Sequence, residues 1–184
     1  MTEIQSREHI ADALAIVAEQ ISTDVSAMTD AQFNAGTEFP WSAAGYLKHL
    51  LITMKMFGRG FRMSQEQLAT QFGVNDSGES KTFDELVVMY DAKMATGWQA
   101  PTPVVPVNYR MPEGIADEKA CLLETWQTVN QQILDLLQNW SEADLDTYQI
   151  PHQAIGVITM REMLFFNVHH NREHQQDIVD AARS

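Results

Sequence analysis

Two histidines four residues apart, His170 and His174, form the first pattern in the sequence that could do chemistry. On an α-helix this spacing places both imidazoles on one face, one turn apart. Neutral imidazole is a good ligand for zinc, nickel, iron and copper, and a helical pair with this spacing can share one ion. The pair alone is a weak indication, because the same spacing often arises by chance.

The surrounding residues indicate that this pair faces the interior of the protein. When the segment is projected at about 100° per residue, the side that carries the pair also carries Met163, Phe166, Asn167, Ile178 and Ala181. The opposite side has the composition of a solvated face and carries Glu162, His169, Arg172, Glu173, Gln176 and Asp180. We therefore expect His169 to lie on the surface, outside the site, although it is the neighbour of His170.

A third histidine, His49, lies in a segment whose only charged stripe consists of Lys48, Lys55, Arg59 and Arg62. His49 shares a covered side of that segment with Tyr46, Thr53 and Met56. One histidine on a buried helix is most often a hydrogen-bonded core residue, but an interior pair elsewhere in a small bundle favours a shared site. Tyr46 and Thr53 could line a pocket beside it, although core packing or hydrogen bonding between helices also explains them.

Helices must position these histidines, and the periodicity of amphipathic helices is found at residues 6–28, 42–62, 82–97, 117–140 and 159–182. The second segment starts at Phe39-Pro40-Trp41-Ser42, with Ser42 as the expected N-cap, and Thr159 with Glu162 forms a capping box at the start of the last. The sequence therefore predicts an all-α fold, a four-helix bundle with one extra helical segment, as a single domain over residues 1–184.

Two segments are predicted to be irregular. Residues 99–113 contain four prolines and are expected to form an extended crossing connection between helices, while residues 72–81 form a loop. Short strand-like pieces such as residues 103–109 are too isolated to make a sheet.

Composition excludes several classes of protein. The 184 residues carry a net charge of −13, which opposes binding to nucleic acids and to anionic membranes. The one local basic patch that could offset this charge consists of Lys55, Arg59 and Arg62. Cys121 is the single cysteine, so no intrachain disulfide forms, and we expect it to be buried in a helix. No secretion signal or membrane-spanning run is found, which predicts a cytoplasmic protein.

Two runs of residues resemble a known family. Residues 40–50, PWSAAGYLKHL, resemble the W-S-x-x-E-x-L-x-H-L start of the second helix in the DinB-like (damage-inducible) superfamily. Residues 170–178, HNREHQQDI, resemble its closing H-x-x-x-H-x-x-Q-I helix. The five helical segments and the long crossing loop fit as well, so the resemblance spans nearly the whole chain. It implies a DinB-like bundle that commonly forms a homodimer, in which His49, His170 and His174 bind one divalent metal ion, nickel or zinc.

The sequence departs from the family pattern at two positions, with Gly45 where glutamate is frequent and Asp177 where glutamine is usual. Asp177 lies on the site side of its helix and could accept a hydrogen bond from the ring N–H of a ligand; pairing with another neighbour is the alternative. Asn167, one turn before His170, is a candidate polar contact for a substrate. We assign neither His9 nor His152, which follows Pro151 in an expected loop, to the site.

Three neutral ligands leave an ion its full charge and at least one open position, as in catalytic sites, where the ion lowers the pKa of a bound water or thiol. The DinB-like superfamily, which the chain resembles, includes enzymes that transfer low-molecular-weight thiols such as bacillithiol and mycothiol. It also includes members with no assigned activity. We therefore expect a metal-dependent enzyme, a thiol S-transferase or a hydrolase, that acts on a small-molecule substrate. The alternative is a non-catalytic stress-response or interaction protein that retains the metal site. A nucleic-acid binder is suggested only by the family name, and the charge argues against it.

Overall fold

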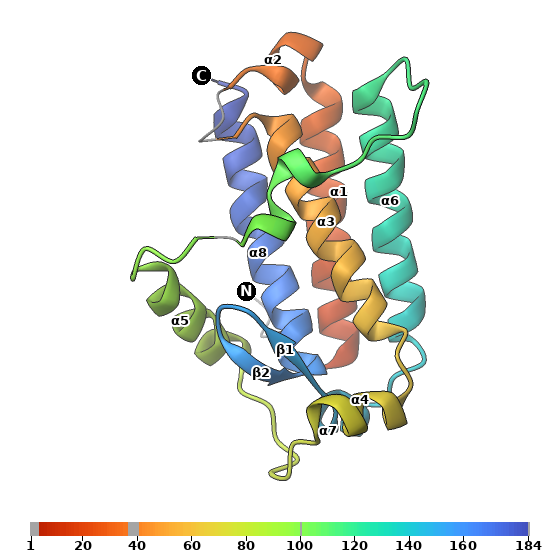
Figure 1. Ribbon diagram of the computed structural model, residues 1–184, viewed down its shortest axis with the longest axis vertical. Helices are drawn as coiled ribbons and strands as arrows, with labels where there is room; N and C mark the ends of the chain where they lie inside the picture. Colours follow the sequence, from red (N-terminus) through yellow and green to blue (C-terminus); the bar gives the residue numbers. More distant parts are fainter. Residues whose placement is uncertain (1–3, 37–40, 100, 184) are drawn as a thin grey trace.

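A computed structural model of the protein describes residues 4–36, 41–99 and 101–183. Four long helices form a bundle, namely α1 (Arg7–Ala27), α3 (Ala43–Phe61), α6 (Glu118–Leu137) and α8 (Met160–Ala181). Both α1 and α3 pack against α6 and against α8, which places α1 and α3 at opposite corners (Figure 1). The predicted all-α fold is thereby confirmed.

The chain direction explains the long connection between α3 and α6. Figure 1 shows that both helices start at the same end of the bundle, so the chain must travel back along the bundle between them. It does so through α4 (Gln65–Phe72), α5 (Phe83–Met94) and two short 3₁₀ turns, η1 (Thr102–Val104) and η2 (Pro106–Asn108). Both turns pack on α3. The stretch that was expected to be fully extended is therefore partly coiled, because a proline is well placed in the first turn of a 3₁₀ helix.

Side-chain caps set where the two site-bearing helices begin. The Ser42 hydroxyl accepts a hydrogen bond from the amide of Gly45 at 3.1 Å, as predicted for an N-cap. Thr159 and Glu162 form the predicted capping box, with hydrogen bonds of 3.1 and 3.0 Å between side chain and backbone in both directions. The Phe39-Pro40 part of the predicted helix start lies outside the described residues.

A small antiparallel hairpin corrects the expectation that the chain makes no sheet. Strand β1 (Gln149–His152) pairs with β2 (Gly156–Thr159), and both contact α8. Gly156 closes the turn with a φ of 84°, a conformation that glycine adopts without strain. Short helices that were not predicted also appear, α2 (Asp30–Asn34) near one end of the bundle and α7 (Glu142–Thr147) before the hairpin.

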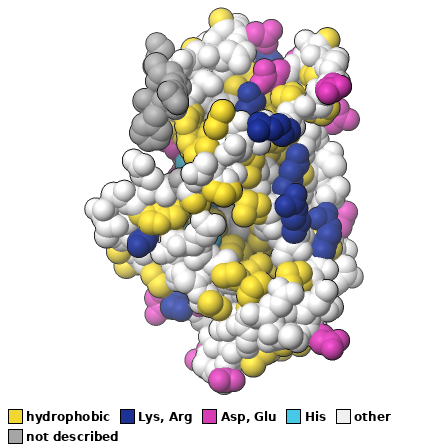
Figure 2. Space-filling model, in the orientation of Figure 1, with side chains coloured by type: hydrophobic (Ala, Val, Ile, Leu, Met, Phe, Trp, Pro, Cys, Tyr) yellow, Lys and Arg dark blue, Asp and Glu magenta, His cyan; other side chains and the backbone are white. Residues whose placement is uncertain are grey.

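The core lies between the four long helices and is filled by large apolar side chains, among them Trp126, Phe33, Phe61 and Phe165. Cys121 on α6 is half-buried rather than buried. No helix among the described residues combines the length and the apolar character needed to cross a membrane. Figure 2 shows apolar side chains gathered around a hollow on one face of the molecule.

Candidate metal centre

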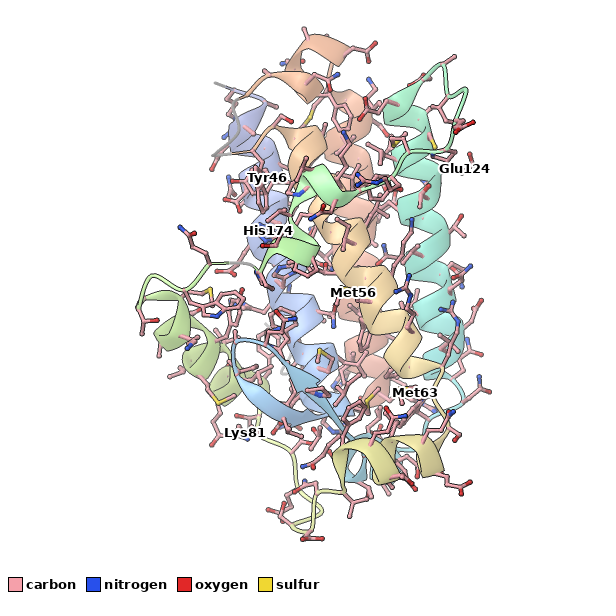
Figure 3. The ribbon with its side chains drawn as sticks, in the orientation of Figure 1. Tyr46, Met56, Met63, Lys81, Glu124 and His174 are labelled. Atoms are coloured by element: carbon pink, nitrogen blue, oxygen red, sulfur yellow. The ribbon has the colours of Figure 1, made fainter. Side chains whose placement is uncertain are left out.

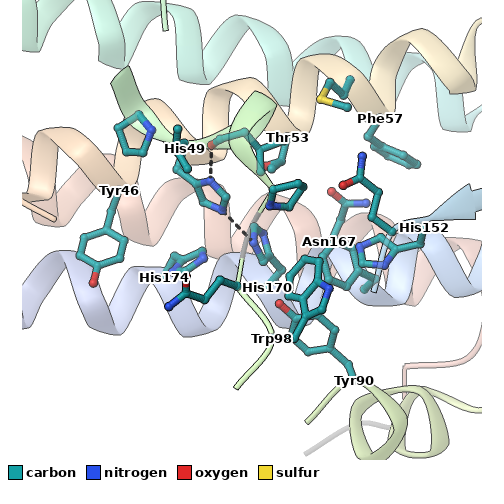
Figure 4. A pocket seen from close by; sticks show the side chains of 18 of the residues that line it. Tyr46, His49, Thr53, Phe57, Tyr90, Trp98, His152, Asn167, His170 and His174 are labelled. Carbon is teal, nitrogen blue, oxygen red and sulfur yellow. Dashed lines mark hydrogen bonds between the residues drawn. The ribbon is translucent and has the colours of Figure 1, made fainter. Parts of the chain in front are cut away.

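The three histidines that the sequence singled out come together between α3 and α8. Each offers a ring nitrogen, and the three nitrogens lie within 4.8 Å of one another. His49 and His170 are 3% and 4% exposed, and their Nε2 atoms are 3.2 Å apart. Figure 4 shows the three rings converging from the two helices.

In two of these rings, a hydrogen bond at one nitrogen determines which nitrogen faces the cluster. The Nδ1–H of His49 donates to the main-chain carbonyl of Val104 in η1 at 2.7 Å. The Nδ1 of His174 lies 2.7 Å from Asp177 Oδ2, which can only accept from it when ionised. The Nε2 of both rings therefore carries the lone pair, and this is the atom each can offer to an ion.

The arrangement fits a metal ion. A tetrahedral ion with bonds of about 2.1 Å holds its ligand nitrogens roughly 3.4 Å apart, close to the 3.2 Å between the Nε2 atoms of His49 and His170. Without a cation, one proton at most can lie between these two atoms. A cation would satisfy all three Nε2 lone pairs at once.

Burial keeps two of the imidazoles in the neutral form that metals bind. Desolvation, aided by repulsion from His174, lowers the pKa of His49 to about 4 and outweighs the hydrogen bond to Val104. The pKa of His170 is held well below its ordinary value by burial and by the neighbouring histidines, His174 first. Near neutral pH neither ring needs to lose a proton before it binds a cation.

The four other candidate site residues predicted from the sequence also contact the cavity beside the histidines, namely Tyr46, Thr53, Asn167 and Asp177. Tyr46 packs on His174 with ring centroids 5.4 Å apart, and Figure 3 shows the two side chains next to each other. Asp177 makes the contact with His174 described above. The Thr53 hydroxyl donates to the Leu50 carbonyl at 2.9 Å, and Asn167 donates to Met163 O at 2.7 Å.

The cavity beside the histidines has a volume of about 1350 Å³ and is bounded by α3, α5, α8, β1 and the connection that carries η1 and η2. Its wall is rich in aromatic rings, which include Trp41, Tyr46, Phe57, Tyr90, Trp98 and Phe166. Val107 of η2, which is 77% exposed, lies at its edge. The centre therefore opens onto a space large enough for a small organic molecule.

One cavity residue was explicitly left out by the sequence reasoning. His152 was placed in a loop, but it is the last residue of β1, and its ring lies 4.2 Å from that of Phe166 between centroids. Helical periodicity could not reveal it, because a strand of four residues that contains a proline has no usable pattern.

A second group of potential ligands lies on the outer side of α8. His169 Nε2 is 3.1 Å from Asp91 Oδ1 and 3.5 Å from Glu173 Oε2. His169 is thus separate from the three-histidine cluster, as predicted, but α5 covers it in part, so it is half-buried rather than exposed. The two carboxylates are about half exposed, and the group is explained as a surface ion-pair cluster.

Comparisons with known proteins bear on the family. The family model described as the DinB superfamily matches residues 13–178, which is most of the chain. Comparisons with curated proteins and with solved structures found no match. The matched span contains all three clustered histidines, both helices that carry them and the crossing connection. The chain therefore belongs to the DinB superfamily.

Proposed function

We propose that this protein is a metal-dependent enzyme that acts on a small molecule at the three-histidine cluster, with nickel or zinc as the bound ion. The observation that carries the proposal is the position of three imidazole ligands on the wall of a cavity of about 1350 Å³. A divalent ion held by three neutral ligands would supply Lewis acidity that lowers the pKa of a thiol or water reaching its open position.

The protein itself prepares the site in three ways. The main-chain carbonyl of Val104 and the carboxylate of Asp177 orient two of the rings. Burial keeps His49 and His170 neutral. The apolar wall excludes water from around the substrate, which strengthens electrostatic interactions inside the cavity.

The lining residues favour a thiol S-transferase over a hydrolase. Asp177 is the one carboxylate among the described residues that line the cavity, and it is already engaged by His174. Activation of water for hydrolysis usually relies on a free general base. A thiol has a much lower pKa than water and needs only to lose its proton near the cation to become a nucleophile. A low-molecular-weight thiol is therefore the proposed co-substrate.

Cobalt substitution tests the proposal. We expect the cobalt-loaded protein, titrated with 2-mercaptoethanol, to develop the near-ultraviolet thiolate-to-cobalt absorption band, and the His170→Ala variant to show none. A cobalt spectrum that stays unchanged at saturating thiol would contradict the enzyme proposal. It would support the alternative, a non-catalytic stress-response or interaction protein that keeps the ion for structure.

A further inference from the structure

A second polar region lies on the cavity wall on the side away from Tyr46, centred on His152 (Figure 4). The backbone N–H of Ala154 donates to His152 Nδ1 at 3.2 Å. Since Nδ1 accepts this bond, the ring proton of the neutral imidazole lies on Nε2. Burial lowers the pKa of His152 to about 4, so the ring is neutral near pH 7 and presents one N–H donor and no charge.

The His152 ring is held in place by its neighbours. Its centroid lies 4.2 Å from that of Phe166 and 6.3 Å from that of Tyr90, which meets it edge on. The centroid of the same Phe166 ring lies 5.0 Å from that of His170, so His152 and His170 both contact this aromatic side chain. A ligand that reaches the metal centre along this wall therefore also passes His152.

Asn167 adds an acceptor to this region. The side chain is 2% exposed, and its amide nitrogen is used by the carbonyl of Met163 at 2.7 Å. Its amide oxygen has no hydrogen-bond partner among the described residues, although the residue lines the cavity. This oxygen is not among the buried polar atoms that lack a partner, so it is open to the cavity and can accept a hydrogen bond from a donor group on a ligand.

No cation faces the cavity from the described part of the chain. None of its lining residues there is lysine or arginine. Lys48 of α3 pairs with Glu118, Lys55 of α3 lies over the ring of Tyr109, and Arg62, the C-cap of α3, bonds Gln132. A carboxylate or phosphate placed near His152 would lose its hydration without gaining a charged partner. The net charge of −13 opposes anions further.

A positively charged ligand is disfavoured as well. The single carboxylate on the described wall, Asp177, is engaged by His174. A divalent ion at the histidine cluster would repel such a ligand and attract an anion, so the preference set by the wall alone is that of the metal-free protein. The polar groups and the aromatic wall together match a ligand that is uncharged and largely apolar.

We infer that the cavity binds an uncharged aromatic molecule bearing a carbonyl or amide group, with His152 Nε2–H donating to its oxygen and the Asn167 amide oxygen accepting from a donor on it. That this molecule is the substrate rests on the proposed function. The binding preference does not rest on the proposed function, because neither His152 nor Asn167 is one of the three clustered histidines.

The test uses four probes of one shape, namely 2-naphthamide, 2-methylnaphthalene, 2-naphthoate and 2-naphthylmethylammonium. Dissociation constants are measured by isothermal titration calorimetry with metal-free and with metal-loaded protein. We expect 2-naphthamide to bind metal-free protein most tightly of the four, and the metal-loaded form shows how far a bound ion shifts the balance towards 2-naphthoate. His152→Phe keeps an aromatic ring but removes the donor. It should raise the dissociation constant of 2-naphthamide about tenfold and leave that of 2-methylnaphthalene unchanged.

Two further variants keep the result interpretable. His152→Gln retains an N–H donor and should keep most of the preference for the amide, while His9→Phe, at an exposed histidine of α1, should change nothing. Metal analysis of each variant should give wild-type occupancy, which separates this proposal from the metal-dependent one. The proposal is overturned if either charged probe binds metal-free protein as tightly as the amide. It is also overturned if His152→Phe leaves the ratio of amide to hydrocarbon affinity unchanged.

Discussion

The histidine cluster combines ligands whose protonation and orientation are both set by their surroundings. Burial favours the neutral ring at His49 and His170, and hydrogen bonds direct the Nε2 atoms of His49 and His174 into the cluster. The ligand arrangement is thus formed before an ion arrives, so little ordering of side chains should accompany binding.

Removal of any one ligand should release most of the metal. We expect His49→Ala, His170→Ala and His174→Ala each to lower metal affinity by more than the roughly 10–100-fold typical of an outer-sphere change. His169→Ala should leave metal content almost unchanged, because His169 lies outside the cluster. Metal analysis of the purified variants after dialysis against a defined metal buffer checks this. Wild-type metal content in the His170→Ala variant would rule the cluster out as the binding site.

The Asp177 carboxylate should tune the affinity without binding the ion. Asp177→Ala removes the acceptor for His174 Nδ1–H, and we expect metal affinity to fall by about 10–100-fold. Asp180→Ala is the matched control, since that carboxylate lies near the end of the same helix and bonds Gln176 and Arg183. Competition with a chromophoric chelator measures the metal affinity of both variants. Equal affinities for the two variants would show that Asp177 does not act on the ligand.

Spacing and helix projection, together with the family resemblance, predicted the three clustered histidines and four further lining residues, but not His152. The i, i+4 pair and the projection of α8 placed two ligands correctly on one face, because a long helix has a fixed periodicity. His152 could not be found in this way, since its place depends on a hairpin packed against α8. Glu162 was predicted to face solvent, but it is buried because it completes the capping box and accepts from the amide of Lys81 at 2.8 Å.

At the scale of elements, the long helices were predictable and the short ones were not. The five predicted segments match α1, α3, α5, α6 and α8 to within a few residues, since each has a cap and an apolar stripe. Helices α2, α4 and α7 have five to eight residues, too few for periodicity to distinguish them from loops. The hairpin packs against α4, which lies about 80 residues earlier in the chain, so its place could not be found from the local sequence.

The Ile150 side chain of the hairpin that carries His152 reaches α3 at a glycine. A Cβ on Gly60 would overlap the Cδ1 atom of Ile150 in β1, although it would lie 3.7 Å from Cγ1. Alanine normally stabilises a helix interior by about 1 kcal/mol relative to glycine. At this position the flexible end of Ile150 must turn away, and a rotamer cost of about 0.5–1.5 kcal/mol should offset that gain.

We expect Gly60→Ala to leave the free energy of unfolding close to that of wild type, because the rotamer cost at Ile150 offsets the gain in helix propensity. In an Ile150→Val background, which lacks the Cδ1 atom, the same Gly60→Ala change should stabilise the protein by about 1 kcal/mol. Urea denaturation followed by circular dichroism measures the stability of each variant. An equal gain from Gly60→Ala in both backgrounds would contradict the close approach of Ile150 to α3.

At the scale of the whole molecule, one arginine joins three distant parts of the chain. Arg161, at the start of α8, bonds Asp146 and Glu142 of α7 and the Gln5 carbonyl before α1. Burial raises the pKa of Asp146, but hydrogen bonds from Arg161 and Ser80 and attraction to Arg161 outweigh this and hold it below its ordinary value. The pKa of Glu142 is lowered in the same manner, by Arg7 and Arg161 against its burial.

These shifts predict loss of stability in acid. Both folded-state pKa values are depressed, so the unfolded chain takes up protons first as the pH falls. Stability from the cluster is complete above the ordinary carboxyl pKa and is lost as the pH falls through the folded-state values. Urea denaturation between pH 7 and pH 3 should show this fall, and Asp146→Asn should be less stable at pH 7 with a shallower pH dependence. An identical pH dependence in wild type and variant would exclude the cluster as the cause.

Assembly into a homodimer, expected from the family resemblance, stays a prediction. Sedimentation velocity at several protein concentrations decides it, and a species of 20.8 kDa throughout would contradict it.

The contact between His49 and the Val104 carbonyl has an evolutionary consequence. A main-chain oxygen is present whatever amino acid occupies position 104, so mutation there cannot delete the acceptor that steadies this imidazole. The orientation of the His49 ring therefore depends on the path of the backbone through η1 and not on the side chain at position 104. Side chains in the connecting segment can therefore change the shape offered to incoming molecules without removing the acceptor, provided that the backbone keeps its path.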